Sequence, residues 1–191
     1  MTAALMFLLV AMAAASVLCI GLRSKPVITI VMPACCAVLL VFALNLCVPI
    51  LGGEVLDAGA FYMDAFSAAF MLLVAFIGLM ASIYSRAYIG LEVEEGIVGR
   101  REQGHYYSLL IVFVSVMMLT FSVRSMAIVW LGIGATTLVS TFLVGFYSKE
   151  ESTEAAWKYI ILCSVGITIA LAGFTLVYAS TVGVIDSDES L

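Results

Sequence analysis

Charged residues are scarce in this sequence, and their scarcity is the first guide to its class. Only 11% of the 191 residues are Asp, Glu, Lys or Arg, whereas 64% are hydrophobic. A soluble domain of this size cannot keep so apolar a surface in solution, so the composition excludes a soluble enzyme and indicates an integral membrane protein. The net charge of -5 lies mainly in connecting segments and at the end of the chain, so it indicates no nucleic acid partner.

Histidine and closely paired cysteines are also lacking. His105 is the only histidine, which excludes a haem held by two histidines and leaves a zinc site short of nitrogen ligands. The cysteines lie inside apolar runs without C-x-x-C spacing, and we interpret them as small buried hydrophobic residues. They are Cys19, Cys35, Cys36, Cys47 and Cys163. We therefore expect no cofactor and no metal.

What the sequence has instead is a series of six long apolar runs. They cover approximately residues 3–22, 27–50, 65–84, 107–123, 126–146 and 157–179. Each run approaches the roughly 20 residues that a helix needs to cross hydrocarbon, and none alternates as a barrel strand would. The sequence therefore predicts an all-α integral membrane bundle of six transmembrane helices, forming one domain over residues 1–180, with an acidic tail at 181–191. The first run lacks a basic start and a cleavage site, so we expect a mature span rather than a removed signal peptide.

The basic residues near the connections predict the orientation of this bundle. Those that follow odd-numbered runs are Arg23, Lys25, Arg86, Arg100, Arg101 and Lys149, whereas only Arg124 follows an even-numbered one. Because lysine and arginine concentrate in cytoplasmic loops, the first, third and fifth connections are predicted to be cytoplasmic. We therefore predict a multi-pass protein of the cell inner (plasma) membrane, with both termini on the non-cytoplasmic side.

Lys158 is the most informative ionisable residue, because it stands at the start of the last apolar run. Removal of an ammonium group from water is costly and favours the neutral amine, which suits a lysine inside the membrane to reversible protonation. In a second interpretation the long side chain reaches the interface, where Trp157 and Tyr159 flank it. Glu154 lies four residues earlier and can pair with Lys158 along one helical face. Both interpretations stay open on position alone.

Two further features favour structural roles but leave functional ones open. Asp64 directly precedes the third run, where its carboxylate is expected to cap a helix, or else to stand at an ion entrance. Thr136 and Thr137 belong to a segment rich in small and hydroxyl side chains, which favours close helix packing or gives a file of water polar edges. In the next connection, Ser152 or Thr153 is expected to cap the last helix.

Two strings carry a family resemblance. One is MDAFSAAFMLLVAFIGLMASIYSRAYI, and the other is WLGIGATTLVSTFLVGFYSKEESTEAAWKYIILCSVGITIALAGFTLVYA. They resemble the antiporter-like membrane subunits of hydrogenase-4 and formate hydrogenlyase complexes, especially the component F kind. Those subunits are related to the large proton-pumping subunits of respiratory complex I and to Mrp sodium/proton antiporters. The resemblance covers roughly residues 60 to 180 and implies the N-terminal part of the antiporter-like fold.

The resemblance implies a non-catalytic membrane subunit of an oxidoreductase complex. Such a subunit binds no redox centre and moves protons, or sodium ions, when an attached soluble hydrogenase or dehydrogenase arm transfers electrons. Lys158 matches the family lysine of the sixth span and is implied as a proton relay. Glu154, Asp64, Thr136 and Thr137 are further candidates for ion translocation. The implied partners are other membrane subunits, the soluble arm and the lipid bilayer.

The sequence departs from the family pattern in two ways. A glutamate usually precedes the ATT string in the fifth span, but Gly134 stands there in this chain. Family members also continue through many more spans, which implies that a separate chain supplies the later antiporter helices. Loss of the acid favours an alternative function, that of a non-pumping structural or docking subunit of such a complex.

Overall fold

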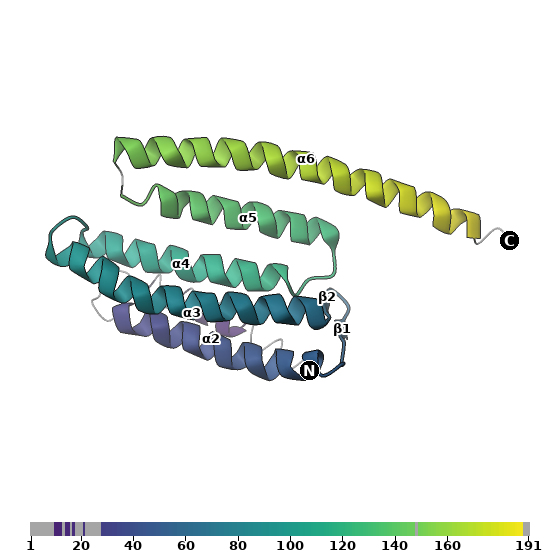
Figure 1. Ribbon diagram of the computed structural model, residues 1–191, viewed down its shortest axis with the longest axis horizontal. Coiled ribbons are helices and arrows are strands. Elements are labelled where there is room, and N and C mark those ends of the chain that lie inside the picture. The colour runs from purple at the N-terminus through teal and green to yellow at the C-terminus, as the bar shows by residue number, and fades with distance from the viewer. Residues whose placement is uncertain are drawn as a thin grey trace.

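The computed structural model describes residues 10–12, 14, 15, 17, 21, 28–147 and 149–188, and long helices dominate it (Figure 1). The helices with defined bounds are α2 (Ile28–Leu51), α3 (Ala65–Glu94), α4 (Arg100–Thr120), α5 (Met126–Val144) and α6 (Glu150–Asp188). All five are long and apolar enough to cross a membrane. The predicted all-α membrane bundle is confirmed, while most of the first predicted span, residues 3–22, lies outside the described residues.

The helices follow one another as antiparallel neighbours. In Figure 1 the chain passes from α2 through α3, α4 and α5 to α6, and each helix packs beside the one before it. This order is the expected result of short connections between consecutive spans. Helix α6 extends well beyond the end of α5.

Three helices are longer than the apolar runs that predicted them. Helix α3 continues to Glu94, α4 begins at Arg100, and α6 begins at Glu150. An apolar run marks only the part of a helix that suits hydrocarbon, and polar residues with good helix propensity extend it beyond that part. One expectation is therefore wrong: Thr153 does not cap α6, because it lies in the first turn, where its N–H donates to the carbonyl oxygen of Lys149 at 2.9 Å. Ser152 lies inside the same turn.

Helices α2, α3 and α4 form a packed core. Its fully buried side chains include Met32, Leu39, Leu46, Met71 and Tyr107. Small residues let these helices approach closely, as they do in many membrane proteins. At Gly78 of α3, an added Cβ atom would lie 2.9 Å from a methyl carbon of Val114 on α4, so a larger residue there would push the two helices apart.

A β-hairpin closes one end of this core. Strands β1 (Leu56–Ala58) and β2 (Phe61–Met63) pair antiparallel and bury the side chains of Leu56 and Met63. The turn between α4 and α5 is held against the hairpin. There the N–H of Arg124 donates to the carbonyl oxygen of Ala60 at 3.0 Å, and its guanidinium donates to the carboxylate of Asp57 at 3.0 Å. The β-hairpin is the connection between α2 and α3, and these bonds tie it to the connection between α4 and α5 at the same end of the bundle.

Helices α5 and α6 form a hairpin that packs on the core through α4. Close contact occurs at Gly132 of α5, where an added Cβ atom would lie only 2.2 Å from the hydroxyl oxygen of Thr120. No residue of α5 is buried, and the most apolar 18-residue window of α6 contains no buried residue. Helix α6 therefore leaves most of its described side chains exposed to lipid or to a partner, whereas most residues of α5 are half-buried.

Candidate functional site

The predicted hydroxyl residues lie on α5, and their own helix satisfies them. The hydroxyl groups of Thr136 and Thr137 both donate to the carbonyl oxygen of Ile133, at 2.8 and 3.0 Å. Such bonds are common for threonine inside a membrane helix. Each hydroxyl oxygen can still accept a hydrogen bond, so the two residues retain a means of binding water, although neither needs a partner.

Two polar contacts set the register between α5 and α6. The indole N–H of Trp130 donates to the carbonyl oxygen of Ile167 at 3.1 Å. Nearer the other end of the helix pair, the hydroxyl groups of Ser140 and Tyr159 lie 3.0 Å apart. Hydrogen bonds between membrane helices stabilise their association modestly, and here they hold the two helices side by side over most of the length of α5.

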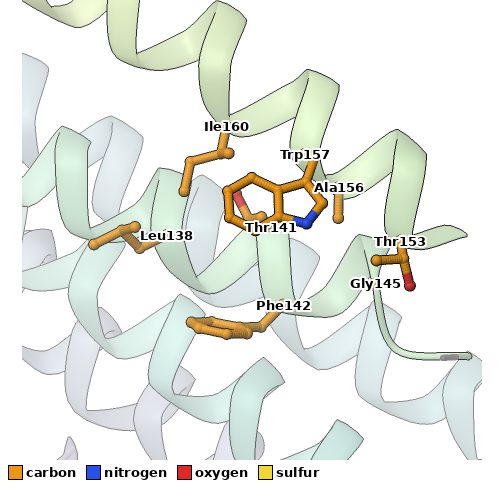
Figure 2. Close-up of a pocket in the computed structure, with 8 residues that line it drawn as sticks. All are labelled: Leu138, Thr141, Phe142, Gly145, Thr153, Ala156, Trp157 and Ile160. Atoms are coloured by element: carbon orange, nitrogen blue, oxygen red, sulfur yellow. The ribbon is translucent and has the colours of Figure 1, made fainter.

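A groove follows this pair of helices. Its first part has a volume of about 300 Å³ and is drawn in Figure 2, where side chains of both helices surround it. The residues that line this part are Leu138, Thr141, Phe142, Gly145, Thr153, Ala156, Trp157 and Ile160. The second part, of about 320 Å³, is also lined by Leu138 and Ile160, so the two parts adjoin.

The second part of the groove contains the position where the family acid is expected. Gly134 lines it together with Thr137 and Ser164, and an added Cβ atom at Gly134 would meet no atom within 4 Å. The structure therefore leaves open space beside this glycine. A larger side chain would fit there without displacing the neighbouring helix.

Glu154 and Lys158 form the predicted ion pair on α6. Their side chains are 64% and 70% exposed, so protein atoms do not enclose the pair. Ala156 and Ile160 face α5, and each is two residues from Lys158, which places the lysine about 200° around the helix from them. Lys158 thus points away from α5, and the structure does not bring it together with Gly134, Thr136 or Thr137.

Asp64 caps α3, as expected. Its carboxylate accepts the N–H of Ser67 at 2.8 Å, and this hydrogen bond lowers the pKa of Asp64 below its ordinary value, because it stabilises the charged form. Helix α3 begins at the end of the bundle opposite to the start of α6 (Figure 1). Asp64 is therefore far from the Glu154–Lys158 pair along the bundle axis.

One polar contact was not foreseen from the sequence. The hydroxyl of Tyr147, in the α5–α6 turn, donates to the carboxylate of Glu92 in the last turn of α3, with both oxygens at 2.9 Å. Burial raises the pKa of the Tyr147 hydroxyl, and its hydrogen bonds with Tyr88 and Glu92 raise it further. Both residues lie near predicted cytoplasmic connections, but nothing in the sequence singles out this pair, since 55 positions separate them.

Potential metal ligands do not gather within the part of the chain that the structure describes: no three His, Cys, Asp or Glu side chains lie close enough to hold an ion. The described residues thus form a polytopic helical membrane protein that carries the Glu154–Lys158 ion pair on an outward helical face. It also has a hydroxyl-rich groove on another side of the same helix pair.

Comparison with known proteins shows which membrane subunits this chain resembles. Residues 58–96 match the model described as NADH-ubiquinone oxidoreductase (complex I), chain 5 N-terminus, and residues 123–187 match that of the NADH:quinone oxidoreductase/Mrp antiporter membrane region. Together the matches span a little more than half of the chain. The chain is thus a relative of the antiporter-like membrane subunits of complex I and hydrogenase-4 type, over their N-terminal region. The resemblance that the two quoted sequence segments indicated is confirmed.

Individual relatives agree with this assignment. A hydrogenase-4 component F homolog from Methylacidiphilum infernorum is 36% identical over 123 residues, which are 64% of this chain and 26% of that protein. NADH-quinone oxidoreductase subunit N 2 from Rhizobium meliloti is 34% identical over 125 residues, or 65% of this chain and 25% of that protein. The chain thus spans about a quarter of the length of the curated relatives that it matches.

Proposed function

We propose that this chain contributes to proton, or sodium ion, translocation coupled to electron transfer in a hydrogenase-4-like or complex I-like assembly. Its homologues are membrane subunits of such complexes, and this similarity supports a place for the chain in a multisubunit membrane oxidoreductase. The observation that carries the finer proposal is the Glu154–Lys158 pair. An acid and a base within one turn of a membrane helix can exchange a proton as their environment changes.

The outward position of this pair defines what it needs in order to work. Because Lys158 points away from α5, an ion path through it has to run on the outer side of α6. We therefore propose that additional membrane helices of the complex cover this side and enclose the pair. A lysine enclosed in this way would lose its contact with water, and Glu154 would be its charged partner.

Asp64, Thr136 and Thr137 are further proposed groups for ion movement, apart from the outer path through Lys158. The domain of residues 1–180 is proposed to lie in the inner membrane with both termini on the non-cytoplasmic side. The proposed partners are other membrane subunits and a soluble hydrogenase or dehydrogenase arm. Purification of the tagged protein in mild detergent, followed by mass spectrometry, tests the partners; recovery of the chain without any oxidoreductase subunit would contradict them.

Gly134 favours a second candidate function. Without a carboxylate in the fifth span, and with open space in its place, the groove contains no ionisable side chain among the residues that line its two parts. A subunit of this kind would act as a structural or docking element of the complex and would not move ions. This alternative keeps the same partners but predicts that Lys158 is dispensable for translocation.

Substitution of Lys158 separates the two functions. In the assembled complex, reconstituted into vesicles, we expect Lys158→Met to remove most ion translocation while electron transfer and subunit composition persist. Arg86→Met is the matched control, because Arg86 is an exposed basic residue of α3, near the same end of the bundle as the start of α6. Unchanged translocation by an intact Lys158→Met complex would contradict the relay and support the structural role.

A further inference from the structure

The end of α3 and the turn before α6 are joined by a contact that bypasses α4. The Tyr147 hydroxyl lies 2.9 Å from each carboxylate oxygen of Glu92, and the hydroxyl of Tyr88, one turn earlier on α3, lies 3.5 Å from it. Glu92 and Tyr147 are both half-buried. A hydrogen bond to a charged acceptor is stronger than one between neutral groups, and it is stronger still where water is partly excluded.

Aromatic packing supports this contact from the side of α4. The ring of Phe146 meets the ring of Tyr106 edge-on, with centroids 5.3 Å apart, and meets the ring of Tyr147 in the same manner at 5.2 Å. The hydroxyl of Tyr106 in turn lies 2.8 Å from that of Ser85 on α3. Edge-to-face aromatic pairs restrict the orientation of both rings. The α5–α6 turn is thus held by α3 and α4 together.

The same turn determines where α6 begins. The ammonium nitrogen of Lys149 lies 6.0 Å from the centre of the Tyr147 ring, a distance that permits a cation–π contact, and α6 begins at the next residue. Glu154 and Lys158 follow in the first turns of that helix. Since a helix moves as a rigid rod over a few turns, the orientation of its start fixes the place of both side chains.

We propose that Glu92 and Tyr147 are positioning residues that form a latch between α3 and the start of α6, and that this latch holds the Glu154–Lys158 pair in place. The importance of the latch for ion translocation rests on the function proposed above, whereas its effect on the position of α6 does not. Opening the latch leaves α5 attached to α4 but allows the α5–α6 turn to move relative to α3.

Distances between spin labels on α3 and α6 test the latch directly. Labels carried by unnatural amino acids at Ile83 and Ile161, both exposed, avoid the native cysteines, and the distance distribution is measured by pulsed electron spin resonance in the full chain within its complex. Loss of a hydrogen bond to a charged group shifts a two-state equilibrium by about tenfold or more. Tyr147→Phe and Glu92→Ala are therefore each expected to raise the displaced population by about that factor.

The variants provide their own controls. The double variant is expected to change the distribution no further than either single one, because both changes remove the same bond. Glu92→Gln, which keeps a carbonyl acceptor for the phenol, is expected to have a smaller effect. Tyr84→Phe is the matched control: Tyr84 stacks on Tyr88 with centroids 5.9 Å apart but is 68% exposed, so its hydroxyl is expected to be dispensable.

The outcomes separate the latch from the proposed function. An unchanged distribution in Tyr147→Phe and Glu92→Ala would overturn the latch, as would effects that add in the double variant. A changed distribution with reduced translocation in Tyr147→Phe supports both proposals. A changed distribution with unaltered translocation supports the latch as a device that positions α6 and counts against ion transfer through Lys158.

Discussion

The α2–α4 core and the α5–α6 hairpin consist of similarly apolar helices but differ in how they are packed. In the core, a third or more of the residues in each span are buried. In α5 and in the apolar window of α6, none is buried. Leu46 and Leu162 are the same residue type in two such helices, yet the first is fully buried and the second is 73% exposed.

Apolar composition alone therefore does not make helices pack against one another in a membrane. Lipid tails are as apolar as leucine, so helices associate through close fit and hydrogen bonds rather than through the hydrophobic effect. In the core, the fit is made at positions such as Gly78. The α5–α6 hairpin approaches α4 closely at Gly132, and α5 and α6 are joined by a few polar bonds, such as that of Trp130 with Ile167.

We expect the greatest loss of stability from a substitution that creates a cavity in the α2–α4 core. Leu46→Ala leaves a cavity among packed side chains, and we expect a loss of about 2–3 kcal/mol of stability, because only the packing contribution is lost within a membrane. Leu162→Ala is the matched control and is expected to change stability by less than about 0.5 kcal/mol. Thermal unfolding of the purified protein in mild detergent measures both, and equal losses would show that α6 is as tightly packed as the core.

We expect a smaller loss of stability from a substitution at the contact between α4 of the core and α5 of the α5–α6 hairpin. In Gly132→Ala, the new methyl group would lie 2.2 Å from the Thr120 hydroxyl, so α4 and α5 have to separate. We expect a loss of about 1–2 kcal/mol from this overpacking. Gly134→Ala, two positions further along α5, meets no atom within 4 Å and is expected to be neutral or slightly stabilising. The same unfolding assay compares them, and destabilisation by both would contradict the open groove.

The smallest effect concerns the cap of α3 and its dependence on pH. Asp64→Ala removes the acceptor for the Ser67 N–H, and we expect it to lower stability by about 1 kcal/mol at neutral pH. Because folding lowers the pKa of Asp64, its contribution is present above the ordinary value of 3.8 and is lost as the pH falls through the lowered one. Unfolding temperatures of the wild type and the variant are therefore expected to converge in acid.

Asp64→Asn provides the control for this prediction. Asparagine caps helices well but does not titrate in this range. We expect the variant to keep most of the stability of the wild type at neutral pH and to lose the dependence on acid that Asp64 introduces. A persisting difference between the wild type and Asp64→Ala at about pH 2, well below the ordinary aspartate pKa, would assign the effect to something other than the carboxylate.

Features that depend on residues close together along the chain were predictable from the sequence. Apolar runs of sufficient length predicted the spans from α2 to α6, since the bilayer requires helices of that length. The cap at Asp64 and the Glu154–Lys158 pair were also predicted, because both join residues three or four positions apart.

Features that join distant parts of the chain became visible only in the folded protein. Strands β1 and β2 are too short to be recognised from the sequence pattern. The hydrogen bond between Tyr147 and Glu92 joins residues that are 55 positions apart. The sequence placed Lys158 on a helix, but which side of α6 meets α5 depends on the packing of Ala156 and Ile160. Nearly uniform apolarity gives such a helix no preferred face in advance, so the side on which the lysine lies is set only when the helices assemble.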